Sequence, residues 1–98
     1  MGELRSHKIT ANRIAKKYNT AYISDKGVDI VTKKVKVEVE TEGNVKSGMQ
    51  QLKGCKGRVY IAGVNQKTVS EALEKTKNTT IGVMDNQGNI KKRSTRKL

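Results

Sequence analysis

Three carboxylates on two short apolar runs are the residues of this sequence best suited to chemistry. Asp29 stands in "VDIVT", and Glu38 and Glu40 stand in "KVKVEVET", within a 98-residue chain whose formal net charge is +12. Strict alternation of valine with charged residues predicts a strand with Lys36, Glu38 and Glu40 on one face and the valines on the other. Acids gathered in this way on a basic chain indicate a site that attracts a cation.

The turn between the two runs decides whether these acids meet. A two-residue turn at residues 33–34 pairs Ile30 with Val37 and Asp29 with Glu38, and the third acid shares their face. Cross-strand neighbours on one face have Cβ atoms about 4.5–5.5 Å apart, and like charges there are destabilising. Because Lys-Lys is a poor turn sequence, a slip of one residue would separate Asp29 from Glu38.

Two interpretations of the acids follow from these residues. A divalent cation, Mg²⁺ or Mn²⁺, would offset the repulsion, because such hard cations prefer carboxylate oxygens. A metal held in this way polarises a phosphoryl group and lowers the pKa of an attacking water. The alternative is a solvated strand face on which Glu38 and Glu40 pair with lysines.

The surrounding pattern resembles a known superfamily of nucleases. "GVDI" is followed after seven residues by "EVE" and then by a predicted helix that contains "QL". This order is similar to that of the PD-(D/E)XK nucleases, which include restriction enzymes, archaeal Holliday-junction resolvases and RecB-type nucleases. The resemblance covers most of the chain and implies a restriction endonuclease-like fold.

The resemblance assigns roles to single residues. Asp29 matches the first metal-binding acid of the motif and Glu38 matches the second, while Glu40 stands where a lysine is usual. Some restriction enzymes of the superfamily also carry a glutamate there, and we expect Glu40 to be a third ligand in this chain. Gln51 matches the glutamine that aligns the site in several branches, with Gln50 as the alternative.

The first predicted helix adds two further candidates. Resolvase-like members of the superfamily place a glutamate of this helix near the metal, which implies a role for Glu3. His7 lies one turn later on the same face of the helix.

Periodicity and turn residues predict an α/β fold, a three-layer sandwich with a central mixed sheet of four to five strands. Residues 1–90 form a single domain and residues 91–98 form a basic tail. The first helix either spans residues 2–19 or begins at Ala11 with Thr10 as its cap. Asn65 or Thr68 caps the helix at 65–78, whose inward residues include Leu73. The other predicted elements are strands at 21–24, 28–32, 34–41, 58–64 and 79–85, a helix at 45–54 and a short return strand at 89–90.

Charge indicates the partner. The chain has 21 lysines and arginines and only nine acids. This excess of positive charge favours nucleic acid as the partner, because neutralised phosphates release counterions. No long apolar run or signal peptide is present, so we expect no membrane contact and an intracellular location, in cytoplasm or nucleoid. Three tyrosines are too few for a stacking surface that binds single strands or RNA. The residues expected to contact phosphates are Lys16, Lys17, Lys33, Lys34, Lys36, Lys91, Lys92 and Arg93.

Two classes of function remain open at this point. The first is a metal-dependent endonuclease that hydrolyses double-stranded or branched DNA, expected as a homodimer. The second is a nucleic-acid-binding protein on the same fold without catalysis, favoured by the missing motif lysine. A small ribosomal or RNA-binding protein is a third alternative, supported by charge alone.

Overall fold

Strands and helices follow one another from residue 28 onward in the order that the hydrophobic pattern predicts. The computed structural model describes residues 5–22 and 28–96. Its elements are α1 (Arg5–Lys17), β1 (Ile30–Val31), β2 (Val35–Glu40), α2 (Val45–Leu52), β3 (Arg58–Gly63), α3 (Gln66–Lys75), β4 (Gly82–Met84) and β5 (Ile90–Lys92).

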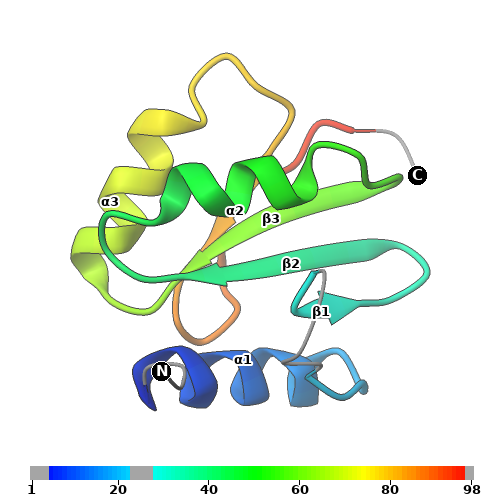
Figure 1. Ribbon diagram of the computed structural model, residues 1–98. Coiled ribbons are helices and arrows are strands. Elements are labelled where there is room, and N and C mark those ends of the chain that lie inside the picture. The colour runs from blue at the N-terminus through cyan, green and yellow to red at the C-terminus, as the bar shows by residue number, and fades with distance from the viewer. Residues whose placement is uncertain (1–4, 23–27, 97–98) are drawn as a thin grey trace.

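The described strands form a single open mixed sheet of five strands in the order β1-β2-β3-β4-β5 (Figure 1). The central pairs β2–β3 and β3–β4 are parallel, and the outer pairs β1–β2 and β4–β5 are antiparallel. The α/β class and the mixed sheet are therefore confirmed. The parallel pairs arise because helices α2 and α3 serve as the crossovers between consecutive strands.

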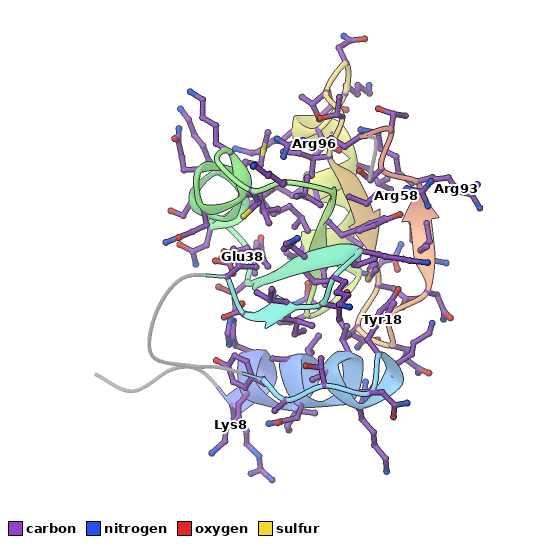
Figure 2. All side chains as sticks on the ribbon, turned by 90° about the vertical axis from the view of Figure 1, so that its right-hand side faces the viewer. Lys8, Tyr18, Glu38, Arg58, Arg93 and Arg96 are labelled. Carbon is purple, nitrogen blue, oxygen red and sulfur yellow. The ribbon has the colours of Figure 1, made fainter. Side chains whose placement is uncertain are left out.

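Helices cover both faces of this sheet. In Figure 2, α1 lies below the sheet, and α2 and α3 lie above it. The core under α1 consists of Ala11, Ile14, Ala15, Ile30, Val37, Val39, Tyr60, Ala62, Val64 and Met84. The core under α2 and α3 consists of Val45, Leu52, Val59, Ile61, Val69, Ala72, Ile81 and Val83. Alternation along β3 sends successive side chains to the two cores, which explains its nearly continuous apolar sequence.

The hairpin has the predicted register. Ile30 pairs with Val37 and Val31 with Lys36. The turn at 33–34 is supported by Thr32, whose backbone N–H donates to the Val35 carbonyl at 2.8 Å. The Thr32 hydroxyl in turn accepts from the Val35 N–H at 2.9 Å. These contacts compensate for a turn sequence that is unfavourable by itself.

The first helix is the longer of the two alternatives. Thr10 is buried inside α1, so a helix that begins at Ala11 is wrong. Asn19 follows the helix with φ of 57°, a left-handed conformation that asparagine tolerates at a helix end. The strand predicted at 21–24 does not form at Ala21 and Tyr22, and residues 23 and 24 lie outside the described ranges.

The third helix is capped by Asn65, whose side-chain oxygen accepts from the Thr68 N–H at 2.9 Å. Val69 and Ala72 are buried as predicted. Leu73, however, is 36% exposed. It is the residue after the buried Ala72, so its side chain projects from the border of the apolar face of the helix rather than from its centre.

Residues 91–96 pack against the sheet, which corrects the expectation of a separate tail. Lys91 and Lys92 belong to β5, and Ser94 is buried. The Ser94 hydroxyl accepts from the Val59 N–H at 3.3 Å and donates to the Thr80 carbonyl at 2.8 Å. Because β4 begins later than β3, the C-terminal segment closes the sheet at this end.

No helix of the described part of the chain is long and apolar enough to span a membrane.

A substitution at Gly82 tests how tightly the C-terminal segment packs against β4. A Cβ on Gly82 would lie 2.5 Å from the Lys92 carbonyl oxygen and from Tyr60 Cε2, and 2.6 Å from the Ser94 nitrogen. We expect Gly82→Ala to lower the free energy of unfolding by about 3 kcal/mol, because backbone atoms cannot move aside cheaply. Denaturant titration followed by circular dichroism measures this loss.

Gly54→Ala is the matched control, because no heavy atom lies within 4 Å of the position that an added Cβ would take. We expect this variant to stay within about 0.5 kcal/mol of the wild type. Equal stability of the two variants would contradict the tight packing of β4 against β5.

Candidate functional site

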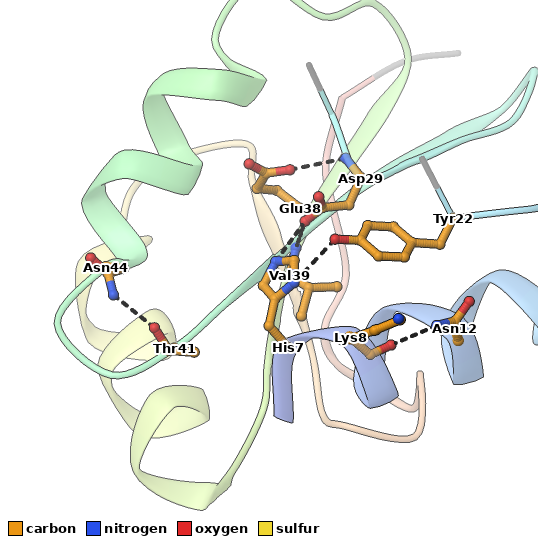
Figure 3. Close-up of polar contacts among 9 residues, drawn as sticks. All are labelled: His7, Lys8, Asn12, Tyr22, Asp29, Glu38, Val39, Thr41 and Asn44. Atoms are coloured by element: carbon orange, nitrogen blue, oxygen red, sulfur yellow. Dashed lines mark hydrogen bonds and ion pairs between the residues drawn. The ribbon is translucent and has the colours of Figure 1, made fainter. Parts of the chain in front are cut away.

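Asp29 and Glu38 meet at the end of the β1–β2 hairpin (Figure 3), and Glu40 follows two residues later in β2. Asp29, Glu38 and Glu40 are 8%, 6% and 9% exposed. The Asp29 backbone N–H donates to Glu38 Oε1 at 3.0 Å, and the Val39 N–H donates to Asp29 Oδ2 at 2.9 Å. Side chains thus continue the hydrogen bonding of the hairpin beyond Ile30, where the regular strand pairing ends.

Helix α1 contributes to the site from one side. His7 Nε2 lies 3.2 Å from Asp29 Oδ2. The Tyr22 hydroxyl lies 3.3 Å from His7 Nδ1, so the imidazole bridges a phenol and a carboxyl group. His7 faces the sheet because it precedes the buried residues Ala11 and Ile14 by one and two turns. His7 therefore orients the Asp29 carboxyl.

Helix α2 closes the site from the other side. A Cβ on Gly48 would lie 2.7 Å from Glu40 Cγ and Oε2, and 2.8 Å from Ile61 Cδ1. A glycine at this position lets the helix backbone pack directly on the Glu40 side chain. The Glu40 carboxyl is consequently held between β2 and α2.

The site destabilises negative charge on two of its carboxyls. Burial, and next the charge of Asp29, raise the pKa of Glu38 to about 8. Burial and the charge of Asp29 also raise the pKa of Glu40 to about 7, and His7 opposes this shift. Protonation of both groups, or a cation beside them, relieves the repulsion at physiological pH.

The alternative of a solvated strand face paired with lysines is wrong for this hairpin. All three carboxyls are buried, and no lysine of the described residues forms an ion pair with Glu38 or Glu40. Lys36 shares their strand face, but its Nζ lies at the other end of β2, 3.7 Å from a Cβ placed on Gly57. The cluster therefore carries no internal counter-charge from Lys36.

The donor set suits a hard divalent cation. Three carboxyl groups supply the oxygen ligands that Mg²⁺ and Mn²⁺ prefer. Within residues 5–22 and 28–96, however, no three His, Cys, Asp or Glu side chains already have the arrangement of a metal site. Their oxygens are turned toward the Asp29 and Val39 N–H groups and toward His7. Metal binding thus requires these side chains to turn from one another toward a common point.

The other residues assigned to the site lie apart from it or beyond the described ranges. Gln50 and Gln51 lie outside the buried stripe of α2, which is Val45, Gly48 and Leu52. Glu3 lies outside the described residues. Tyr22 and Gly48 were not predicted as parts of the site. The spacing of His7 from Ala11 is the one sequence signal that favours its inward position.

The predicted phosphate-contacting residues divide into engaged and free groups. Lys17 Nζ donates to the Gly88 carbonyl at 2.8 Å. Lys92 Nζ donates to the carbonyls of Thr76 at 2.6 Å and Ile81 at 2.8 Å, which caps the end of α3. Lys91 lies 3.9 Å from an Asp85 carboxylate oxygen. The exposed or half-buried side chains for which no such contact is described are Lys16, Lys33, Lys34, Lys36 and Arg93.

The raised pKa values predict a pH-dependent stability. Above pH about 5 the unfolded chain has released the protons of Glu38 and Glu40, whereas the folded protein retains that of Glu40 up to pH about 7 and that of Glu38 up to pH about 8. The free energy of unfolding should therefore fall as pH rises, by up to about 1.4 kcal/mol per pH unit for each group. Denaturant titrations across this range, in EDTA, measure the slope.

Glu38→Gln should reduce this slope, because an amide cannot titrate and only Glu40 then contributes. Glu42→Gln replaces an exposed glutamate two residues beyond Glu40 and should keep the wild-type slope. A wild-type profile that is already flat from pH about 5 to 8 would contradict the raised pKa values.

Comparison with known proteins assigns no family to this site. A scan of the chain against protein-family models gives no match, and searches of curated proteins and of solved structures give none either. The assignment of a function therefore depends on the geometry and chemistry of the residues described above.

Proposed function

We propose that this protein is a metal-dependent endonuclease that hydrolyses phosphodiester bonds of double-stranded or branched DNA. The observation that carries the proposal is the meeting of the buried Asp29 and Glu38 carboxyls on one hairpin. Glu40 lies on the same strand face and is also buried. Buried acids of this kind, with strongly raised pKa values, are typical of functional sites.

The arrangement of elements supports the restriction endonuclease-like part of the proposal. A helix precedes the acidic hairpin, and helices lie on both faces of the mixed sheet. We interpret this arrangement as a three-layer sandwich of the PD-(D/E)XK type. The acids stand on the hairpin at one side of the sheet, as the motif order implies.

Asp29, Glu38 and Glu40 are the proposed ligands of Mg²⁺ or Mn²⁺. The bound ion supplies Lewis-acid activation of the phosphodiester and of the attacking water. Asp29 is oriented by the Val39 N–H and by His7. Glu40, with a pKa near 7, can exchange a proton at neutral pH at the position where the motif lysine is usual.

The location and assembly belong to the same proposal. We place the protein inside the cell, in cytoplasm or nucleoid, where DNA is accessible. A homodimer would present two sites to the two strands of a duplex or of a junction.

A second candidate is a nucleic-acid-binding protein without catalysis. The hydrogen bonds among Asp29, Glu38 and Val39 favour it, since they stabilise the hairpin without any metal. Under this alternative the acids serve to end the β1–β2 pairing and to hold α1 through His7.

Cleavage assays separate the two candidates. We expect the wild type to cut supercoiled, linear or four-way-junction DNA with Mg²⁺ or Mn²⁺ and to be inactive in EDTA. Asp29→Asn and Glu38→Gln should each lower the rate by about 100-fold or more, because a metal ion stabilises the transition state by several kcal/mol. Gel analysis of the cleavage products measures the rates.

A control variant and a measurement of metal binding accompany the cleavage assays. Glu74→Gln removes an exposed acid of α3 and should leave the rate unchanged. Mg²⁺ or Mn²⁺ at pH about 8 should raise the melting temperature of the wild type but not that of Glu38→Gln. Cleavage that survives Asp29→Asn would contradict the assigned site, and DNA binding without metal-dependent cutting would support the second candidate.

A further inference from the structure

Positive side chains gather at the end of the sheet where β2 and β3 begin. Arg58 is the first residue of β3 and pairs with Val35, the first residue of β2. The turn at 33–34 places two exposed lysines beside this pair, and the Lys34 carbonyl accepts from the Arg58 N–H at 3.3 Å. Figure 2 looks onto this end, with Arg58, Arg93 and Arg96 labelled in its upper half.

Arg58 carries a donor without an acceptor. Its Nε is buried, yet it makes no hydrogen bond to any described residue. No described acid forms an ion pair with this guanidinium. Buried polar groups are nearly always hydrogen-bonded, so Arg58 keeps donor capacity that no described residue uses.

Arg93 lies at the same end of the sheet. Tyr60 and Ala62 belong to the core under α1, so alternation along β3 puts Arg58 on that face as well. Lys92 reaches the end of α3 on the opposite face, and alternation therefore turns Arg93 toward the face of Arg58. Arg93 is exposed.

Strand β4 separates the two arginines, and its Gly82 offers no side chain between them. Arg93 lies opposite Gly82 and Tyr60, two residues along the strand from Arg58. Two strand spacings and this offset put the two Cα atoms roughly 12 Å apart. The Tyr60 ring fills the space over Gly82. This ring is buried, and no described acid pairs with either guanidinium group.

Arg96 differs from these two residues. Its Nη1 donates to the Cys55 carbonyl, and its Nε donates to Thr80 Oγ1 at 3.1 Å. Arg96 thus fixes the C-terminal segment against the loop before β3, and this holds Ser94 and Arg93 in place.

We propose that Lys34, Arg58 and Arg93 form a binding surface for the phosphodiester backbone of a nucleic acid. The surface follows the end of the sheet from the hairpin turn to β5, rather than converging on a single pocket. A row of cations of this kind fits a polyanion with regularly spaced charges, and arginine binds phosphate through paired donors. The inference rests on the proposed function for the identity of the partner, but the surface requires neither a metal nor cleavage.

The test measures binding in EDTA, so that cleavage plays no part. The probe is a short fluorescently labelled DNA duplex, and anisotropy gives the dissociation constant between about 50 and 200 mM salt. We expect Arg58→Gln with Arg93→Gln to weaken binding and to reduce the slope of log K against log salt by about 2, because two phosphate contacts are lost.

The control removes the same charge elsewhere. Arg5→Gln with Lys8→Gln changes two exposed residues of α1, where Lys8 points away from the sheet end in Figure 2. This variant should keep the wild-type slope to within about 0.5, because it loses no phosphate contact. Arg58→Lys with Arg93→Lys preserves the charge and should keep most of the slope. This variant still tests the surface if the glutamine variant fails to fold.

The outcomes distinguish this inference from the proposed function. An unchanged slope in the glutamine variant, or an equal loss in the α1 control, would overturn the phosphate surface. Polyglutamate that displaces the duplex as well as unlabelled DNA does would identify an acidic protein as the partner and overturn it too. A reduced slope in a protein that never cuts DNA would uphold the surface and refute the nuclease.

Discussion

The rest of the site depends on two hydrogen bonds between Asp29 and strand β2. The Asp29 N–H donates to the Glu38 carboxyl, and the Asp29 carboxyl accepts from the Val39 N–H. These bonds replace the next rung of the β1–β2 ladder, which explains why β1 is only two residues long. They also bring two carboxyls together in a buried place, so the same contacts that end the hairpin create the repulsion that a proton or a cation must offset.

The hairpin was predictable because its signals are local. Alternation from Val35 to Glu40 determines which side chains share a face, and the two-residue turn determines which residues oppose one another. The unfavourable Lys-Lys turn made a register slip an open alternative. Thr32 removes that ambiguity by closing the turn with its hydroxyl and its N–H, a contribution that a turn rule based on the central residues alone does not count.

The remaining parts of the site depend on contacts between distant segments. Helical spacing favours an inward position for His7, but no sequence pattern indicates which residues it meets. His7 and Tyr22 meet through the packing of α1, and Ser94 satisfies the backbone of Val59, 35 positions earlier. Composition also cannot tell a free cation from an engaged one. Lys92 looks like part of a basic tail, yet it caps α3, whereas Arg58 looks like the start of an apolar strand.

The separation of charge along β2 and β3 connects the two proposals. Glu38 lies three residues beyond the strand start that pairs with Arg58, about 10 Å along the strand. It also lies on the opposite face of the sheet, because Val37 and Val39 share the α1 face with Tyr60. Arginines in direct contact with the acids would neutralise them and leave a cation nothing to bind. Placed at the other end of the strands, they can hold a phosphate backbone while the carboxyls keep their mutual repulsion. Retained protons relieve this repulsion in the protein alone, and a divalent cation that displaces them from Glu38 and Glu40 would relieve it in their place.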